Sequence, residues 1–459
     1  MGVNVTIPKG TRDFLPLQMV KRNYIFEILR DVFQLYGYQQ IETPSMENLG
    51  TLLGKYGEEG DKLLFRILNS GDFLSGVDEN DLNNKNIATL ASKFCEKGLR
   101  YDLTVPFARF VVMYKNELTF PFKRFQIQPV WRADRPQKGR YREFYQCDVD
   151  VIGSDSLLNE FELLKIIDEV FIRLKLKVTV KLNNRKILTG LAEYIGYPDK
   201  LVPITVAMDK IDKAGKDSVC NELRSTGISD DAINRLFDLI DISKGLSPEQ
   251  LIEKMSDKNM PDAFLQGLNE MAELYAYVAV SGVAANISFD MSLARGLSYY
   301  TGTILEVVSD EVAMGSICGG GRYDDLTGIF GLPGLSGVGM SFGAERIYDV
   351  LTALNRFPVE SPSKTKVLVT CFGGETVPFA IEMADLLRKN GVPTEMYPDT
   401  KAKMKKQFSY ADNNVIPWVI IIGEDEVKTG KAGLKNLQTG EQVVLSPVEI
   451  INLLKKNLT

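Results

Sequence analysis

The 459-residue sequence contains no histidine. Imidazole is a common general base, the middle member of Ser-His-Asp triads and the commonest metal ligand in proteins. Its absence excludes such triads, two-histidine metal sites and histidine-based pH switches. Any catalysis by this chain must therefore use carboxylates, arginines, lysines, hydroxyl groups or bound ions.

Cysteine is also scarce, and long apolar runs are missing. The five cysteines are an odd number and form no Cys-x-x-Cys pair: Cys95, Cys147, Cys220, Cys318 and Cys371. This usage favours a reducing, cytoplasmic compartment and argues against a zinc cage. No run approaches the roughly 20 apolar residues that span a bilayer, and the segment MGVNVTIPKGTRD lacks the apolar core of a secretory signal.

The remaining composition is that of an ordinary globular protein, with 44% hydrophobic and 25% charged residues and a net charge of −6. The length predicts about three domains. Because the chain is not basic overall, a nucleic-acid partner would have to be bound by local basic patches.

The first part of the chain mixes helical and extended patterns. Apolar residues at helical spacing predict a helix over Val20–Tyr36, and residues 69–93, rich in Asn, Asp, Gly and Ser, predict a surface loop or hairpin insertion. Strand-like residues 122–133 and 142–153, joined by a basic connector, predict a hairpin. A further amphipathic helix is expected over Leu157–Leu174.

The second part begins with a strongly helical stretch, residues 183–285, which we interpret as a helical insertion. Strands and glycine turns resume at Ile287 and lead to a helix after Gly343. Residues 355–365 form a Pro/Ser linker. Beyond it, a β-α-β-α-β pattern predicts a small α/β domain, whose 13 basic and 11 acidic residues from residue 364 onward suit a polyanion mildly better than the rest of the chain does.

Arginines are the strongest candidates for chemistry. Five lie on or beside predicted strands and turns: Arg132, Arg140, Arg142, Arg295 and Arg346. A planar, permanently charged guanidinium grips phosphate oxygens well, so these residues suit a polyphosphate held across a sheet. The alternative is that they pair structurally with neighbouring carboxylates: Glu143, Asp148, Asp150 and Glu345.

Two other patterns are ambiguous when taken alone. The glycines of GGGRYDDL (Gly319–Leu326) permit close approach of a ligand to the backbone, but a bulge or turn is the expected explanation, and no Walker lysine follows. Tyr299–Tyr300 with Asp102 and Thr104 suit a polar pocket, although paired strand tyrosines also pack sheets. These patterns together favour a phosphate-handling α+β enzyme with an appended α/β domain.

The same blocks resemble the histidyl-tRNA synthetases, which are class II aminoacyl-tRNA synthetases. PKGTRDFLP resembles the amino-terminal signature of that family, IETPSMENL its motif 1 with Pro44 at the dimer-interface position, and GVGMSFGAERI its motif 3. Residues 122–153 resemble motif 2, while LARGLSYYTG and GGGRYDDL resemble the two histidine-specific blocks. The resemblance implies a class II antiparallel-sheet core flanked by helices, a helical insertion and a carboxy-terminal α/β anticodon-binding domain.

The resemblance also implies roles for individual residues. It assigns histidine binding to Asp102, Leu103, Thr104, Arg132, Gln146, Asp150, Arg295, Tyr299 and Tyr300. It assigns ATP binding to Arg132, Arg140, Glu143 and Arg346, and catalysis to Arg132, Arg295 and Arg346. The expected domains are the catalytic core in two parts, the insertion, the linker and the anticodon-binding domain: 1–182 and 286–354, 183–285, 355–365, and 366–459.

The implied activity is formation of histidyl-adenylate and pyrophosphate from histidine and ATP, followed by transfer of histidine to the 3′ end of its tRNA. The histidine carboxylate is itself the nucleophile, so the reaction needs positioning and positive charge rather than a general base. The implied cofactor is Mg²⁺ brought with ATP, without a side-chain metal cage. The implied assembly is a cytoplasmic homodimer without a membrane contact.

Two alternatives belong to other functional classes. The first is the inactive, synthetase-like regulatory subunit of an ATP phosphoribosyltransferase, a paralogue that usually lacks the carboxy-terminal domain and loses motif residues. The second is a histidine sensor that binds uncharged tRNA, which would need an effector domain. Two positions depart from the family pattern: Asp325 stands where glycine is frequent, and Ala344 where a bulkier residue is common.

Overall fold

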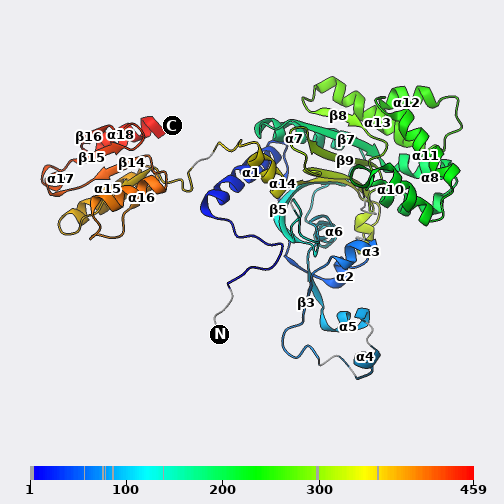
Figure 1. The fold of residues 1–459 in the computed structure, drawn as a ribbon, viewed down its shortest axis with the longest axis horizontal. Coiled ribbons are helices and arrows are strands. Elements are labelled where there is room, and N and C mark those ends of the chain that lie inside the picture. The colour runs from blue at the N-terminus through cyan, green and yellow to red at the C-terminus, as the bar shows by residue number, and fades with distance from the viewer. Residues whose placement is uncertain are drawn as a thin grey trace. The chain divides into compact units, whose positions relative to one another are not determined.

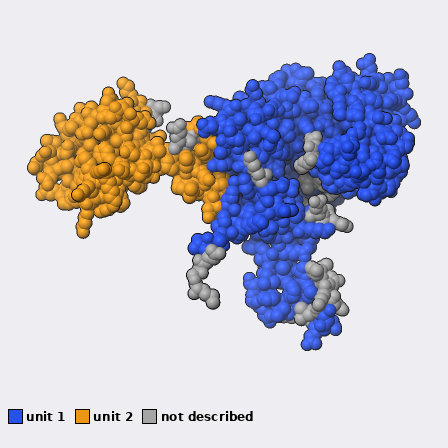
Figure 2. Space-filling view, in the orientation of Figure 1, with its two compact units in different colours: residues 1–12, 24–356 blue, residues 13–23, 357–459 orange. Residues whose placement is uncertain are grey.

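The computed structural model describes residues 5–55, 57–74, 77, 79–84, 87–137, 139–295, 299–358 and 361–458. The chain divides into two compact units (Figure 2). The larger unit contains residues 1–12 and 24–356, and the smaller contains residues 13–23 and 357–459. No helix among the described residues combines the length and the apolar character needed to cross a membrane.

The larger unit is built on an eight-stranded sheet with the order β1-β5-β6-β11-β10-β9-β7-β8. Its strands are β1 Gln39–Gln40, β5 Phe122–Trp131, β6 Glu143–Ile152, β7 Val178–Asn184, β8 Asn286–Phe289, β9 Thr303–Ser309, β10 Cys318–Asp324 and β11 Ser336–Gly343. The six central strands pair antiparallel, and only the edge strands β1 and β8 pair parallel. The predicted antiparallel core and the predicted β5–β6 hairpin are confirmed.

Helices α7 (Leu158–Arg173) and α14 (Ala344–Ala353) and the part of α1 (Pro16–Leu35) from Tyr24 onward belong to this core, with α6 (Thr104–Met113) beside it (Figure 1). Phe33 of α1 packs against Phe125, with ring centroids 5.5 Å apart, and Phe171 of α7 packs against Phe342 at 5.9 Å. These contacts bury one face of the sheet. Helix α1 begins four residues earlier than predicted, because the Gln18 side chain accepts a hydrogen bond from the Leu15 amide and closes the first turn.

Strand alternation gives the opposite sheet face a polar character. On β5, Phe125 points into the helix-covered core, whereas its fully buried neighbours Arg124 and Gln126 lie on the other face. The same period of two places Asp148 and Asp150 of β6 beside them. The polar face of this hairpin therefore becomes the floor of the site described below.

The predicted helical insertion lies between β7 and β8. It consists of α8 Arg185–Tyr194, η1 Pro198–Lys200, α9 Leu201–Met208, α10 Ile211–Ser225, α11 Asp230–Ser243, α12 Pro248–Met255 and α13 Asp262–Ser281. Helices α8 and α13 pack closely because Gly190 faces Phe264, where an added Cβ would lie 2.5 Å from that residue. This part of the prediction is confirmed.

The larger unit also contains a small three-stranded sheet with the order β2 (Met46–Asn48), β4 (Lys97–Leu99) and β3 (Arg66–Ile67). Its strand β2 belongs to the motif 1 segment. Helices α2 Leu49–Leu52 and α3 Gly57–Lys62 lie beside this sheet, and η2 Leu326–Phe330 follows β10. The prediction of a loop or hairpin insertion is only partly right. Strands β3 and β4 do pair, but the chain between them forms two helices, α4 (Glu79–Asn84) and α5 (Ile87–Phe94) (Figure 1). Polar residues dominated the pattern there and concealed the helical spacing of IATLASKF.

The smaller unit is an α/β domain with the strand order β13-β12-β14-β15-β16. Its elements are β12 Val367–Val369, α15 Thr376–Lys389, β13 Thr394–Met396, α16 Met404–Asn413, β14 Trp418–Ile421, α17 Glu424–Thr429, β15 Ala432–Asn436, β16 Gln442–Leu445 and α18 Pro447–Leu458. The predicted β-α-β-α-β pattern is confirmed. Two antiparallel strands and a final helix extend it.

Candidate active site

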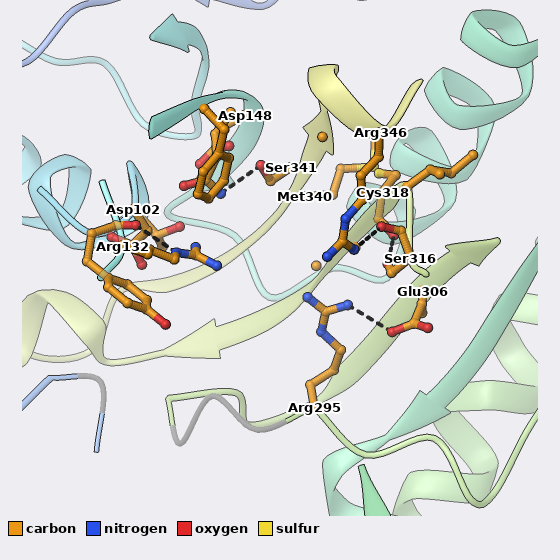
Figure 3. Close-up of a pocket in the computed structure, with 18 of the residues that line it drawn as sticks. Asp102, Arg132, Asp148, Arg295, Glu306, Ser316, Cys318, Met340, Ser341 and Arg346 are labelled. Carbon is orange, nitrogen blue, oxygen red and sulfur yellow. Dashed lines mark hydrogen bonds and ion pairs between the residues drawn. The ribbon is translucent and has the colours of Figure 1, made fainter. Parts of the chain in front are cut away.

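A cavity of about 420 Å³ lies in the larger unit, over the polar face of the sheet (Figure 3). Its walls come from β6, β9, β10 and β11, from the start of α6 and α14, and from the connector between β5 and β6. Most predicted site residues line it: Asp102, Thr104, Arg132, Arg140, Gln146, Asp150, Arg295, Tyr299, Tyr300 and Arg346. Residues of the motif 2 segment and of three other sequence segments, around residues 102, 295 and 346, are thus brought to one place.

One end of the cavity carries hydrogen-bond acceptors from β6. Gln146 donates through Nε2 to Ser341 Oγ at 2.8 Å, while Asp150 Oδ1 accepts from the Tyr323 hydroxyl at 2.8 Å. Within the described structure, the buried atoms Gln146 Oε1 and Asp148 Oδ1 accept no hydrogen bond. Buried acceptors without donors are costly, so this end is suited to a ligand that carries N–H groups.

The two aspartates share a buried cation that the sequence analysis did not single out. Arg124 Nη2 lies 2.7 Å from Asp150 Oδ2 and 3.9 Å from Asp148 Oδ2. Burial raises the pKa of Asp148 to about 7 and also raises the pKa of Asp150, while the Arg124 charge opposes both shifts. Asp148 and Asp150 therefore do pair with an arginine, but not with any of the five proposed from the sequence.

Glycines let the backbone and these side chains approach closely. An added Cβ on Gly339 would lie 1.8 Å from Asp150 Oδ1, and one on Gly319 would lie 2.2 Å from Arg295 Nη1. The expectation of a bulge or turn at the glycine run is wrong, because residues 319–321 lie inside strand β10. Glycine is required here because neighbouring groups pass too close to β10 for a side chain. At Gly320, for example, an added Cβ would lie 2.1 Å from the carbonyl oxygen of Gly339.

Another part of the cavity, called the arginine end below, is rich in arginine. In Figure 3 the side chains of Arg346 and Arg295 point toward one another, and Arg132 and Arg140 also line the cavity. Burial, followed by the charges of Arg140, Arg132 and Arg295, lowers the pKa of Arg346. An anion bound between these guanidinium groups would relieve their mutual repulsion.

Backbone carbonyls hold two of these arginines in place. Arg346 donates through Nε to the Gly139 carbonyl at 3.0 Å and also donates to Ser316, and Arg132 donates to the Tyr101 carbonyl at 3.1 Å. Among the described residues, neither Arg132 nor Arg346 has an ion-pair partner. Their positive charge is therefore available to a ligand in the cavity, because no salt bridge within the described structure neutralises it.

The other two arginines have one acidic partner each. Arg295 Nη1 lies 3.3 Å from Glu306 Oε2, and Arg140 Nη1 lies 3.6 Å from Asp134 Oδ1. The Arg140 pair is partly exposed and therefore weak. The structural-pairing alternative holds in part for these two, but with partners other than those expected.

Aromatic and hydroxyl groups complete the acceptor end. The rings of Tyr299 and Tyr300 have centroids 4.9 Å apart, and Tyr299 meets Tyr323 edge-on at 6.4 Å. Asp102 Oδ1 accepts a hydrogen bond from the Val105 amide at 3.1 Å, which holds this carboxylate at the first turn of α6. Residues 296–298 of the LARGLSYYTG block lie outside the described residues.

Three predicted residues point elsewhere. Leu103 is fully buried in the core, so its side chain does not line the cavity. Glu143 accepts a hydrogen bond from Trp131 Nε1 at 2.8 Å at the outer end of the hairpin. Arg142 reaches the amino-terminal segment instead, where its backbone amide donates to the Gly10 carbonyl at 2.9 Å.

The sequence analysis missed other residues of the cavity wall: Asp148 as a wall residue, Asp209, Glu306, Tyr323 and Gly339. The Q-x-D-x-D alternation in β6 was the signal for Asp148, because it places that carboxylate on the same face as Gln146 and Asp150. Asp209 follows α9 of the helical insertion, and no local pattern indicates that it would reach this cavity.

The departure at Asp325 has a clear geometry. Its φ is +63°, in the left-handed region that favours glycine and that aspartate tolerates better than most residues. Its Oδ1 accepts a hydrogen bond from the Gly334 amide at 2.7 Å, which stabilises the turn after β10. The substitution therefore keeps the backbone conformation that glycine would supply.

Comparison with known proteins agrees with this architecture. A family model described as Histidyl-tRNA synthetase matches residues 10–77 and 95–347. The chain belongs to the histidyl-tRNA synthetase family. It is accordingly an aminoacyl-tRNA ligase, and a model described as Anticodon binding domain matches residues 366–457 of the smaller unit.

Relatives of this family match the whole chain. A protein from Bacteroides fragilis (strain YCH46) named histidine–tRNA ligase is 56% identical over 456 residues, covering 99% of this chain and 100% of the relative. A crystal structure of histidyl-tRNA synthetase from Nostoc sp. PCC 7120 matches with a TM-score of 0.81 and 29% identity, covering 99% of this chain and 100% of that one.

The regulatory-subunit alternative has weaker support. A structure titled as an ATP phosphoribosyltransferase regulatory subunit/histidyl-tRNA synthetase from Bacillus halodurans C matches with a TM-score of 0.69 and 21% identity, covering 90% of this chain and 97% of that one. At that identity the likeness shows a shared fold alone. Full-length relatives named as ligases favour the synthetase reading over the regulatory one.

Proposed function

We propose that the cavity binds histidine at its acceptor end and ATP at its arginine end, forms histidyl-adenylate and pyrophosphate, and transfers histidine to the 3′ end of tRNA. One observation carries this proposal: a single cavity in a member of this ligase family joins buried acceptors without donors to a cluster of arginines. The substrates that fit are a molecule with N–H groups at one end of the cavity and a phosphate compound at the other.

Histidine binding is assigned to the acceptor end. Asp102 and Thr104 take the α-ammonium group, and Gln146 and Asp150 also face the amino acid. Tyr299 and Tyr300 line the imidazole pocket. Leu103 can contribute only through its backbone, because its side chain is in the core. A pocket that hydrogen-bonds imidazole leaves its own polar groups unpaired around an apolar analogue, which supports strong selectivity without editing.

Catalysis is assigned to the arginine end. The histidine carboxylate attacks the α-phosphorus of ATP, the new bond joins carboxylate oxygen to phosphorus, and the bond to pyrophosphate breaks. Arg132 holds the carboxylate and α-phosphate, Arg295 stabilises the α-phosphate from the opposite side, and Arg346 binds the γ-phosphate end. No general base takes part, because the nucleophile is already anionic.

Arg140 and Glu143 belong to the motif 2 hairpin and its connector, where the proposal places contacts with ATP. Arg140 lines the cavity, so it would contact ATP directly. Glu143 faces Trp131 at the outer end of the hairpin. For Glu143, the acceptor end of tRNA entering from outside is a better-placed partner than the nucleotide.

Mg²⁺ is proposed to enter with ATP. Among the described residues no group of three or more acidic or cysteine side chains is placed to hold a metal. Glu306 lies at the arginine end, 3.3 Å from Arg295 Nη1, so it would share the ion with phosphate oxygens, the usual arrangement for Mg²⁺. Bound there, the ion would neutralise phosphate charge.

The remaining partners are proposed on the family and on local composition. The smaller unit, matched by an anticodon-binding family, would contact tRNA. The motif 1 segment around Pro44, with Met46 55% exposed on β2, would form a homodimer interface. The cytoplasm is the compartment that suits five cysteines that form no disulfide among the described residues. A solution mass near twice 51.3 kDa would support the dimer, and a mass of 51.3 kDa would exclude it.

The test of function is ATP–pyrophosphate exchange with each of the twenty amino acids in turn, in the presence of Mg²⁺. The proposal predicts exchange with histidine alone, followed by charging of tRNA. Absence of exchange from folded protein that still binds histidine would overturn the proposal and favour the regulatory alternative.

A further inference from the structure

The β5–β6 hairpin presents an ordered polar array to the floor of the cavity. In the strand register three cross-strand pairs share one face: Arg124 with Asp150, Gln126 with Asp148, and Gln128 with Gln146. Directly opposite residues on one face are close enough to interact through their side chains. The acceptors of the cavity on β6 therefore lie beside a second row of residues on β5, which does not itself line the cavity.

Arg124 is the charged member of this second row. It is fully buried, and it is not part of the cavity wall. Its guanidinium lies 4.2 Å from the ring centre of Phe107, its Nη1 donates to Gln126 Oε1 at 3.3 Å, and its Nη2 reaches Asp150 at 2.7 Å. Arg124 therefore cannot touch a ligand in the cavity, and it acts on the ligand only through the aspartates.

In the part of the chain that the structure describes, no other cation forms an ion pair with Asp148 or Asp150. The titratable and charged groups that face the Asp148–Asp150 pair are Arg124 and Arg100, Asp102, the thiol of Cys318, and the tyrosines Tyr38, Tyr300 and Tyr323. Arg100 donates its hydrogen bonds to carbonyl groups of Thr43, Pro44 and Pro129 and to Thr43 and Gln128 side chains. Among the described residues Arg124 is the cation within ion-pair distance of the two aspartates.

We propose that Arg124 is a positioning residue that keeps the Asp148–Asp150 pair largely ionised above neutral pH, so that both carboxylates accept hydrogen bonds from the N–H groups of histidine. The inference rests on the proposed function of the cavity. Two buried carboxylates i and i+2 on one strand repel each other, and without a cation one of them retains a proton. A protonated carboxyl group would present a donor to the donors of the substrate.

The direct test counts protons. Histidine binding, without ATP, is measured by calorimetry at pH 8 in buffers of different ionisation enthalpy, for the wild type and for Arg124→Leu. The wild type should release almost no proton, and Arg124→Leu should release up to about one, because its pair must ionise to bind. The chain's lack of histidine removes the side chain that would otherwise titrate near neutrality.

Steady-state kinetics give a second readout. At pH 7, Arg124→Leu should raise the KM for histidine about 10- to 100-fold, the range for losing a hydrogen bond to a charged group. The KM for ATP should change little. The histidine KM should fall back toward the wild-type value as pH rises to 9. Arg124→Lys keeps the positive charge and should behave like the wild type in proton release and within a few-fold in KM.

Arg322→Leu is the matched control. Arg322 is also a buried arginine of the sheet and is ion-paired to the buried carboxylate of Glu160 at 2.5 Å, but neither residue lines the cavity. Its replacement should lower stability without changing proton release on histidine binding. If Arg124→Leu does not fold, the Arg124→Lys variant decides the question. Proton release on histidine binding equal to that of the wild type supports the proposal, and release of about one proton by this variant refutes it.

The outcomes separate this inference from the proposed function. Wild-type protein that binds no histidine would refute both. Wild-type protein that binds histidine, together with an Arg124→Leu variant that binds it with unchanged proton release and unchanged pH dependence, would refute the role of Arg124 alone. An equal rise in the KM values for histidine and ATP would show a merely structural role.

Discussion

The two ends of the cavity are built on opposite physical principles. At the arginine end, guanidinium groups stay charged whatever their surroundings, and backbone carbonyls aim Arg132 and Arg346 into the cavity. At the acceptor end, the charge of Asp148 and Asp150 is marginal, because burial raises the pKa of both. The comparison teaches that phosphate binding here depends on placing fixed charges, whereas amino-acid binding depends on maintaining a charge.

The largest effect should come from removing a fixed charge. Arg295→Ala should slow adenylate formation by about 100-fold or more, because positive charge at the α-phosphate is lost while the fold persists. Pyrophosphate exchange measures it. Arg173→Ala, which removes a partly exposed arginine of α7 paired with Glu169, is the control and should leave exchange unchanged. Near-normal exchange in Arg295→Ala would remove Arg295 from the chemistry.

A smaller effect, confined to the acceptor end, should come from Gly339→Ala. The added Cβ would lie 1.8 Å from Asp150 Oδ1, so the carboxylate must move out of its place. We expect the KM for histidine to rise about 10- to 100-fold with the KM for ATP little changed. Gly50→Ala, where no atom lies within 4 Å of the added Cβ, is the control. A rise in both KM values would contradict the separation of the two ends.

A smaller difference between the two ends should appear in the pH dependence of the KM for histidine. The pKa of Asp148 is raised to about 7 by burial, so lowering the pH through 7 protonates this acceptor. The KM for histidine should then rise by up to about tenfold per pH unit, since each unit reduces the ionised fraction tenfold. Asp148→Asn should remove this component, while the titration of free histidine affects both proteins alike. Identical pH profiles for the two proteins would refute the assignment.

The free energy of unfolding should also depend on Asp148, because burying its charged form is unfavourable. Because the pKa of Asp148 is higher in the folded protein than its ordinary value of 3.8, the folded state binds more protons between about pH 4 and 7, and the free energy of unfolding falls as pH rises through that window. Asp148→Asn should flatten this slope and stabilise the ligand-free protein at pH 8 by about 1–3 kcal/mol. Urea unfolding at pH 5 and pH 8 measures it, and an unchanged slope would contradict it.

Much of the fold was predictable from local patterns. Alternation of apolar and polar residues gave the β5–β6 hairpin, and helical spacing gave α7 and the helices of the insertion. The smaller unit followed from its regular succession of strands and helices. These elements are determined by neighbours in the sequence, which is why their periods of 2 and 3.6 sufficed.

The site was less predictable where it depends on pairing across the sheet. Gly319–Gly321 suggested a turn, because nothing local shows that β11 and Arg295 cross close to β10. The carboxylates of β6 were considered as partners of the arginines in the connector. Their actual partner, Arg124, lies directly across the hairpin, and only the register reveals it.

Equilibrium binding of histidine in the absence of ATP tests the two-ended cavity most directly, with Arg346→Ala and Gly339→Ala compared by calorimetry. The account predicts that Arg346→Ala binds histidine within about threefold of the wild type, since it alters only the phosphate end, and that Gly339→Ala loses about 10-fold or more in affinity. The reverse order, with Arg346→Ala the weaker binder, would contradict it.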